Sequence, residues 1–202
     1  MGVKERRERE KEALRREILD AASELFVEEG YQSVSMRKIA EKIEYSPTTI
    51  YLYFRNKAEL IATICDETFQ EMIGIHEQIN AHEPDPLARL RKGLRAYVDF
   101  GLAHPSHYIL TFMTPFSDDD FPEEYVYESS SGGRSFDTLR SSVRYCVEHR
   151  VFRDVDVEVT SQALWAVIHG VTSLLIAHPQ FPWADRDTVV DTAIDAAIAG
   201  FR

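Results

Sequence analysis

Residues 35–60, SMRKIAEKIEYSPTTIYLYFRNKAEL, decide the fold of this 202-residue chain. Apolar residues recur from Met36 to Ile43 with the spacing of one helix face, and Ser35 is suited to cap that helix. The dipeptide Ser46-Pro47 then supplies a second N-cap, followed by a proline at the first helical position. Two short helices joined by a three-residue turn have the dimensions of a helix-turn-helix.

Spacing alone favours an ordinary corner between two helices. The outward face of the second short helix is what favours a DNA-binding helix-turn-helix instead. A solvated helix normally carries Lys and Glu, but this face is uncharged and rich in hydroxyl groups. Its residues are Thr48, Thr49, Tyr51, Leu52 and Tyr53. Hydroxyls can contact phosphates, and threonine methyl groups can contact thymine. Arg37 and Lys38 on one side, with Arg55 and Lys57 on the other, are predicted to anchor phosphates.

Helical periodicity continues through the rest of the chain, and no stretch shows sustained strand-like alternation, so we predict an all-α fold. The expected helices are 5–29 ending at Gly30, 35–43, 46–54, 57–80, one from Pro86, a shorter one from Pro105, one through 136–147, 157–178 and 185–201. Residues 115–133 are predicted to form a loop that includes at most one short turn of helix. We expect an N-terminal three-helix domain at 1–56, which contains the helix-turn-helix, and a C-terminal helical domain at 57–202.

The net charge of −11 argues at first against a nucleic-acid partner. However, residues 1–60 hold 12 basic and 12 acidic side chains, so the whole negative excess lies in residues 61–202. The charge distribution therefore predicts which end of the molecule faces DNA. The charged N-terminus has no apolar core of a signal peptide, which favours a cytoplasmic location.

Residues 159–177 carry no formally charged side chain, yet their polar residues favour a fully buried helix over a membrane span. The last helix is apolar on two faces as well, so a single protomer is not expected to cover both helices. We therefore predict a homodimer built on these helices. Its predicted interface residues are Val171, Leu174, Leu175, Val190, Ile194 and Ile198.

The run from Ser35 to Leu60 resembles the DNA-binding domain of the tetracycline-repressor (TetR) family of bacterial transcription regulators, and the likeness covers about residues 12–62. The resemblance implies that Ser46, Thr48, Thr49, Tyr51 and Tyr53 touch bases or phosphates, that Arg37 and Lys57 contact phosphates, and that Ile50 and Phe54 belong to the core. Adding the neighbouring positions, the predicted DNA-binding set is Ser35, Arg37, Ser46, Pro47, Thr48, Thr49, Tyr51, Leu52, Tyr53 and Lys57.

Two positions depart from the family pattern. Glu44 stands in the turn where relatives often have Gly, and a left-handed backbone there would cost roughly 1–2 kcal/mol. Pro47 holds the first base-reading position without an N–H or a polar side chain, so direct readout is expected to depend on the threonines and Tyr51.

The resemblance further implies a ligand-responsive regulator, most simply a repressor, that binds a palindromic operator as a dimer and is released by a small-molecule effector. In this family a cavity between the C-terminal helices binds the effector, so the resemblance implies that 57–202 is a helical ligand-binding and dimerisation domain. Aromatic walls suit an apolar or aromatic molecule. The predicted lining is Phe100, His104, Tyr108, Phe112, Trp165 and His169, although aromatic residues at helical spacing are more often core. Trp165 to Gly170 also resembles the Trp…His-Gly element of one C-terminal subclass, with an ordinary core pair as the alternative.

Other functions find weaker support in the sequence. His104 and His107 suggest a metal sensor, but no Cys accompanies them and Pro105 lies between them, so no metal or cofactor is predicted. Redox sensing is weak as well, because Cys65 and Cys146 both fall on apolar helix stripes. No nucleotide-binding, metalloprotease or hydrolase motif is present, so an α-helical enzyme is disfavoured. An architectural DNA-binding protein without operator preference remains a competing class.

Overall fold

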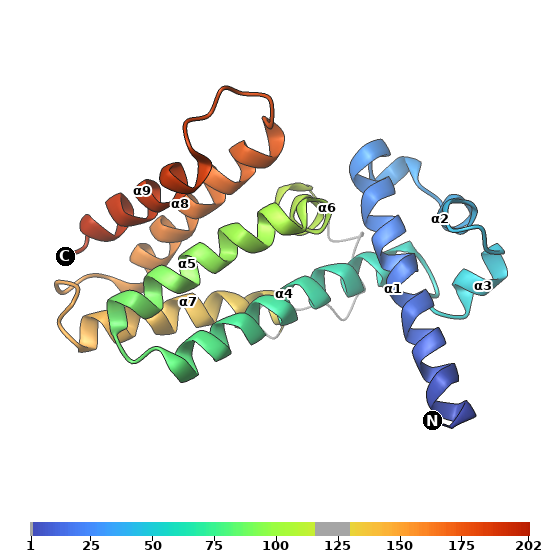
Figure 1. The fold of residues 1–202 in the computed structure, drawn as a ribbon, viewed down its shortest axis with the longest axis horizontal. Coiled ribbons are helices and arrows are strands. Elements are labelled where there is room, and N and C mark those ends of the chain that lie inside the picture. The colour runs from blue at the N-terminus through green and yellow to red at the C-terminus, as the bar shows by residue number, and fades with distance from the viewer. Residues whose placement is uncertain (1, 116–129) are drawn as a thin grey trace. The chain divides into compact units, whose positions relative to one another are not determined.

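The computed structural model describes residues 2–115 and 130–202, which are helical and contain no strand, so the all-α prediction is confirmed (Figure 1). The elements are α1 (Val3–Glu29), η1 (Tyr31–Ser33), α2 (Met36–Lys42), α3 (Pro47–Tyr51), α4 (Lys57–His82), α5 (Pro86–Ala103), α6 (Pro105–Tyr108), η2 (Ile109–Met113), α7 (Ser131–Glu148), α8 (Val157–Ala177) and α9 (Arg186–Ala199). Contacts divide the described residues into two compact units, one of residues 2–65 with 109–115 and one of residues 66–108 with 130–202.

The first unit packs α1, α2, α3 and the first turns of α4 around a small apolar core. Its fully buried side chains share the inward faces of these helices and are Ile18, Ala22, Ile39, Ala40, Ile50, Leu60, Ile61 and Ile64. Phe54, just after α3, is also buried, so Ile50 and Phe54 lie in the core as the resemblance implies. The predicted boundary at residue 57 coincides with the start of α4, while the contacts divide further along that helix, after Cys65.

Side-chain caps begin the two short helices where the sequence predicts them. The Ser35 hydroxyl accepts a hydrogen bond from the backbone N–H of Lys38 at 3.2 Å. The Ser46 hydroxyl accepts one from the N–H of Thr49 at 3.2 Å, with Pro47 at the first helical position. In the turn between the helices, Glu44 has φ of 60°, so it adopts the left-handed conformation that was expected to be costly.

The second unit is a helical bundle in which α5 packs against α7, α8 and α9. Close approach at Gly101 sets part of this packing, because a Cβ built there would lie 2.5 Å from Cγ2 of Thr172 and 2.7 Å from Cδ2 of Tyr108. Ion pairs join the helix surfaces: the Arg91 guanidinium meets the Asp195 carboxylate at 2.7 Å, and Arg140 meets Glu158 at 2.6 Å. These pairs raise the pKa of both guanidinium groups.

One predicted loop is partly helical. The predicted loop at 115–133 overlaps α7, which begins at Ser131, and its Gly132 and Gly133 are buried helical residues. The Ser130 hydroxyl caps this helix by accepting a hydrogen bond from the N–H of Gly133 at 3.2 Å. Gly132 and Gly133 form the buried first turn of α7, which continues into the helix that the sequence predicts through 136–147. The remainder of the predicted loop, 116–129, lies outside the described residues.

The predicted dimer interface is wrong for four of its six residues. Leu175, Val190, Ile194 and Ile198 are buried in the protomer's own core, because α8 and α9 turn these faces toward each other and toward α5. Leu174 is 49% exposed and Val171 is half-buried, so only these two remain available to a partner.

A single protomer buries α8 only in part, which is the expectation for a helix that a second copy is predicted to cover. Only 33% of its most apolar 18-residue window is buried, although the helix is long and apolar enough to cross a membrane by those two criteria. One such helix is weak support for a span, because the core helix of a soluble protein passes the same test.

Candidate DNA interface and ligand site

The exposed surface of α3 carries apolar and hydroxyl side chains in place of charged ones. Tyr51 is 54% exposed and Leu52 is 78% exposed, and Thr48 beside them also faces solvent. Ile50 on the opposite side is fully buried and fixes which face of this short helix points outward. Large exposed apolar side chains on a helix that follows a helix-turn-helix turn are suited to the edges of bases in a DNA groove.

The remaining predicted contacts on α3 divide by exposure and hydrogen bonding. The hydroxyls of Ser46 and Thr49 lie 2.9 Å apart, so part of their hydrogen-bonding capacity is used within the first turn. Pro47, Thr49 and Tyr53 are half-buried, whereas Arg37 is exposed at the start of α2. The structure therefore presents Thr48, Tyr51 and Leu52 as the outermost part of the face, with the others around it.

Lys57 at the start of α4 is engaged with the protein itself. Its ammonium group donates hydrogen bonds to the backbone carbonyls of Tyr31 at 2.6 Å and Val34 at 3.0 Å, and it lies 4.1 Å from the centroid of the Tyr31 ring. These contacts tie the η1 connection, which leads from α1 to α2, to the beginning of α4. Lys57 therefore positions the helix-turn-helix, a role that the sequence pattern did not reveal.

Two other predicted anchors are paired with acids. Lys38 forms an ion pair with Glu29, and the Arg55 guanidinium lies 3.3 Å from the Glu59 carboxylate. Because both pairs are partly exposed, each basic group can exchange its carboxylate for another anion at small cost.

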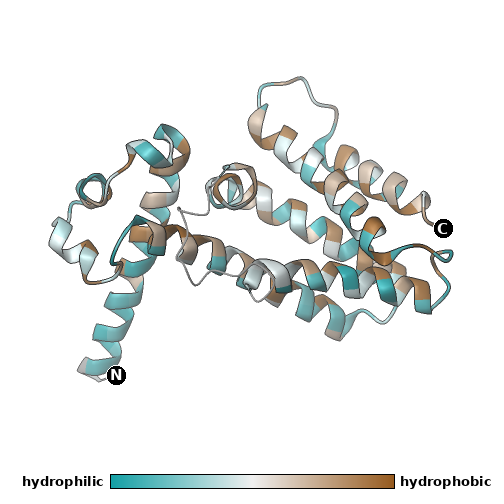
Figure 2. Cartoon of the chain, turned by 180° about the vertical axis from the view of Figure 1, so that it is seen from behind, coloured by the Kyte–Doolittle hydropathy of each residue, from teal (hydrophilic) through white to brown (hydrophobic). Residues whose placement is uncertain are grey.

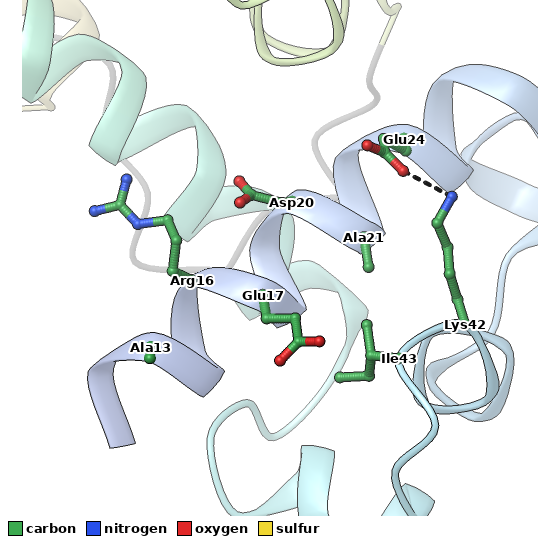
Figure 3. A pocket seen from close by; sticks show the side chains of 8 residues that line it. All are labelled: Ala13, Arg16, Glu17, Asp20, Ala21, Glu24, Lys42 and Ile43. Carbon is green, nitrogen blue, oxygen red and sulfur yellow. Dashed lines mark ion pairs between the residues drawn. The ribbon is translucent and has the colours of Figure 1, made fainter. Parts of the chain in front are cut away.

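A surface hollow of about 410 Å³ lies between α1 and the end of α2 (Figure 3). Its lining is Ala13, Arg16, Glu17, Asp20, Ala21, Glu24, Lys42 and Ile43. At its edge the Lys42 ammonium meets the Glu24 carboxylate at 2.8 Å, and this contact raises the pKa of Lys42. The sequence did not predict this hollow. With three acids against two basic groups it does not favour an anion, and the Lys42–Glu24 pair holds α2 against α1.

The second unit contains a chain of hydrogen-bonding aromatic groups. The indole N–H of Trp165 donates to the Tyr97 hydroxyl at 3.2 Å, the hydroxyls of Tyr97 and Tyr108 are 3.0 Å apart, and Tyr108 lies 2.7 Å from Nδ1 of His169. Tyr97 and Tyr108 are buried, whereas Trp165 is 37% exposed. The aromatic chain, defined as these four residues, therefore leads from the core of the bundle to its surface.

The donor is fixed at one end of the aromatic chain. The indole N–H of Trp165 can only donate, so the Tyr97 oxygen accepts it, whereas a hydroxyl can both donate and accept in the contacts of Tyr97 with Tyr108 and of Tyr108 with Nδ1 of His169. Nδ1 of His169 also lies 3.3 Å from the Tyr97 hydroxyl. Partial burial lowers the pKa of His169, and burial raises the pKa of Tyr108 to about 12.

The structure brings together three of the six predicted ligand residues: Tyr108, Trp165 and His169. Phe100 is buried and its ring lies 5.0 Å from the ring of His104, which is exposed at the end of α5. Phe112 lies in η2, within the other unit.

Sequence reasoning missed two residues of this unit. Tyr97 joins the aromatic chain through its buried hydroxyl, and helical periodicity can indicate burial but not such a hydrogen bond. Thr68 of α4 is 2% exposed, and its hydroxyl has no hydrogen-bond partner among the residues described. A buried hydroxyl without a partner is costly, so Thr68 is a candidate to bind a ligand.

The described residues offer little to a metal ion or to redox chemistry. Across residues 2–115 and 130–202, no group of three or more His, Cys, Asp or Glu residues gathers in a geometry that could hold a metal ion. Cys65 and Cys146 are both buried, and burial raises the pKa of Cys146 to about 11, which keeps that thiol protonated.

Comparison with known proteins agrees with both halves of this description. Residues 18–64 match the tetR family of bacterial regulatory proteins, and residues 90–199 match the tetracyclin repressor-like C-terminal domain. The transcriptional activator FasR of Mycolicibacterium smegmatis is 25% identical over 190 residues, which is 92% of this chain and 78% of FasR.

Two further relatives have names linked to fatty acids. A fatty acid metabolism regulator protein of Bacillus subtilis is 37% identical over 57 residues, which is 28% of this chain and 29% of that protein. The structure of FadR from Bacillus subtilis, solved with stearoyl-CoA, superposes with a TM-score of 0.74 at 17% identity over 92% of this chain and 98% of FadR. The chain, with its helix-turn-helix unit and its helical C-terminal unit, belongs to the TetR family and is a ligand-responsive, DNA-binding transcriptional regulator.

Proposed function

We propose that this protein is a cytoplasmic repressor that binds a palindromic operator as a homodimer and leaves it when a small apolar effector binds. The observation that carries the proposal is the outward face of α3, where Thr48, Tyr51 and Leu52 are exposed on a helix whose other side is buried. In a dimer, two such helices would enter successive major grooves roughly 34–36 Å apart. Palindromic half-sites follow from the twofold symmetry.

The predicted DNA-binding residues take different parts in this proposal. Thr48, Tyr51 and Leu52 would contact base edges, with Pro47, Thr49 and Tyr53 beside them. Ser35, Arg37 and Ser46 would contact phosphates at the rim of the groove. Lys57 would act by holding η1 and α4 together while its charge strengthens the local positive potential.

The second copy would cover the apolar surface that one protomer leaves exposed. Along α8 this surface is the stripe Ala163, Val167, Gly170 and Leu174, spaced as one helix face. Along α9 it is Val189, Ala193 and Ala197, all half-buried. We name these seven residues the α8–α9 stripe. Small residues at four of the seven positions allow close helix packing, so the stripe replaces the four buried residues as the proposed interface.

A fatty acyl effector is the best-supported ligand class. FadR of Bacillus subtilis was solved with stearoyl-CoA, and FasR shares 25% identity with this chain. Here the aromatic chain and the unpartnered Thr68 hydroxyl would supply polar contacts within a mainly apolar bundle. In this proposal the segment from Trp165 to Gly170, which resembles the Trp…His-Gly element, would contribute Trp165 and His169 to the ligand site.

Binding would act on DNA affinity through α4, whose first turns belong to the first unit and whose remainder belongs to the second. An effector that binds one conformation of the second unit more tightly changes the position of α4, and with it the spacing of the recognition helices. A preference of about 1.4 kcal/mol for the released conformation lowers DNA affinity about tenfold.

Two experiments test the proposal. Repeated selection from a random duplex library should enrich a sequence with twofold symmetry, and an enriched asymmetric site would contradict the dimeric repressor. For the effector, Trp183→Phe leaves Trp165 as the single tryptophan of a chain that has two. Its fluorescence should change with stearoyl-CoA but not with free coenzyme A, and the same addition should release the selected duplex.

The sign of regulation needs a cellular readout, because the FasR relative is named an activator. A reporter gene placed behind the selected duplex should be silenced by the protein and restored by the effector. Increased reporter expression in the presence of the protein alone would make it an activator.

A further inference from the structure

The N-terminal half of α1 has no share in the core of the first unit. The 27-residue helix becomes buried only from Ile18 onward, and residues 4–13 are all exposed. Figure 1 shows this end of α1 projecting beyond α2 and α3, and Figure 2 colours it teal, the colour of hydrophilic residues. A helix segment that is polar on every side gains little from tertiary packing. We therefore look for its function in a contact between its exposed side chains and a partner.

One face of this segment is basic, and it continues the face that is buried further along. Lys4, Arg7 and Lys11 are spaced at i, i+3 and i+7, which places them on one side of the helix. The same spacing next reaches Leu14 and then Ile18, which is fully buried. The basic stripe, defined as Lys4, Arg7 and Lys11, therefore lies on the side of α1 against which the rest of the domain packs.

The acids of the segment do not neutralise this stripe. Arg6, on a different side, pairs with Glu10 at 2.7 Å, and Arg15 lies 3.9 Å from Glu12. In the described part of the chain no ion pair involves Lys4, Arg7 or Lys11. Glu8 borders the stripe and reduces its positive charge locally, but it forms no ion pair with the three basic residues.

The basic stripe begins about one helical turn before Arg15, which lies beside the residues that follow the recognition helix α3. The Arg15 guanidinium lies 5.7 Å from the centroid of the Phe54 ring, and Phe54 comes shortly after α3. At a rise of about 1.5 Å per residue, Lys11 lies about 6 Å and Lys4 about 16 Å further along α1. The stripe itself spans about 10 Å, which is the axial length of about three nucleotides of one DNA strand.

We propose that the basic stripe of α1 is a second DNA-contact surface, which binds backbone phosphates next to the groove occupied by α3. The proposal rests on the proposed placement of α3 in the major groove. Charge complementarity selects the partner, since three cations without internal partners face the side where the DNA-reading helix lies. Because phosphates are the same in every sequence, this surface adds affinity without adding sequence preference.

Salt dependence of binding tests the proposal. The variant Lys4→Ala/Arg7→Ala/Lys11→Ala should bind the duplex selected with the unaltered protein at least about tenfold more weakly at 100 mM KCl. Its plot of log affinity against log salt should become shallower by about 0.9 for each phosphate contact removed, or about 3 for each protomer. Its preference for the selected duplex over a random duplex should stay within roughly twofold.

A charge-matched control separates contact from net charge. Arg6→Ala/Arg9→Ala/Arg16→Ala removes the same number of positive charges from the same helix but from other faces. It should change the salt slope by less than about one unit. An equal loss in both variants, or an unaltered slope in the Lys4/Arg7/Lys11 variant, would overturn the proposal.

A second variant distinguishes this proposal from the function on which it rests. Thr48→Ala/Tyr51→Ala should remove the preference for the selected duplex while keeping most of the salt slope. If that variant retains full preference for the selected duplex, the placement of α3 in the major groove is wrong. The proposed position of the basic stripe next to that groove is then wrong as well. Circular dichroism of each variant should show unchanged helix content, since all the substituted residues are exposed.

Discussion

Two helices of this protein, α3 and α8, expose large apolar side chains, but the chemistry around those side chains differs. On α3, Tyr51 and Leu52 are surrounded by hydroxyl groups, and basic residues lie at the ends of the helix-turn-helix. On α8, Val167 and Leu174 are 37% and 49% exposed along a stripe of small apolar residues with no charge within it. The first surface suits a polyanion with apolar base edges, and the second suits another apolar helix.

The comparison shows that exposure alone does not identify a partner. An apolar residue next to hydroxyls and cations fits DNA, whereas the same exposure next to alanine and glycine fits a close-packed helix. Each surface can therefore be tested by a substitution that the other surface would tolerate.

The largest expected effect comes from placing charge on the α8–α9 stripe. Val167→Glu/Leu174→Glu should convert a dimer of about 46 kDa into a monomer near 23.2 kDa in light scattering after size exclusion. The reason is that two carboxylates per protomer would have to be buried without partners. DNA affinity should fall when the dimer is lost, because a monomer contacts one half-site of the operator whereas a dimer contacts two.

A control for that variant comes from the connector between α8 and α9. Phe181 is 57% exposed and lies outside the stripe, so Phe181→Glu should leave the elution mass unchanged. If Val167→Glu/Leu174→Glu also elutes as a dimer, the proposed interface is wrong.

A smaller effect is expected where α5 approaches α8. Gly101→Ala should lower the free energy of unfolding by about 1–3 kcal/mol, because the added Cβ meets Thr172 at 2.5 Å and Tyr108 at 2.7 Å. Gly74→Ala on α4 is the matched control, since no atom lies within 4 Å of the added Cβ, and it should stabilise the helix slightly. Urea unfolding measures both, and equal stability of the two variants would contradict the packing described.

The aromatic chain predicts a change of about 1 kcal/mol. Tyr97→Phe removes the hydroxyl that accepts from the Trp165 indole and that hydrogen-bonds with the Tyr108 hydroxyl, so the free energy of unfolding should fall by about that amount. Tyr45→Phe, at an exposed position of the first unit, should have no measurable effect. If stearoyl-CoA binding to Tyr97→Phe matches that of the unaltered protein, the aromatic chain does not contribute to the ligand site.

The pH dependence is the mildest expected effect. Burial lowers the pKa of both His76 and His169 from the ordinary value of 6.5, so the unfolded chain takes up protons before the folded protein does. Stability should therefore be complete above about pH 7 and decline as the pH falls below about 6.5. His76→Leu should flatten that decline in Tm between pH 7.5 and 5.5, and an unchanged decline would exclude His76 as a cause.

The first unit could be read from the sequence because its function depends on short-range patterns. Ser35 and Ser46 cap the helices that follow them, and Glu44 marks a turn only a few residues long. Each of these features is local, so residue spacing was sufficient to predict it. Lys57 is the exception, since its contact with the Tyr31 carbonyl joins positions 26 residues apart.

The second unit could be predicted only in outline. The helix starts at Pro86 and Pro105 were read correctly, but periodicity cannot say which of two apolar faces turns inward. For that reason Ile194 was assigned to an interface although it is fully buried. Tyr97 and Trp165 are 68 residues apart, and only tertiary packing brings their polar atoms together.

The central claim is that the outward face of α3 reads DNA, and Thr48→Ala/Tyr51→Ala tests it most directly. Both residues face solvent, so their removal should leave helix content and Tm unchanged. Fluorescence anisotropy with the selected duplex should show affinity reduced by roughly 10- to 100-fold and preference over random DNA largely lost. Unchanged affinity and preference would contradict the account.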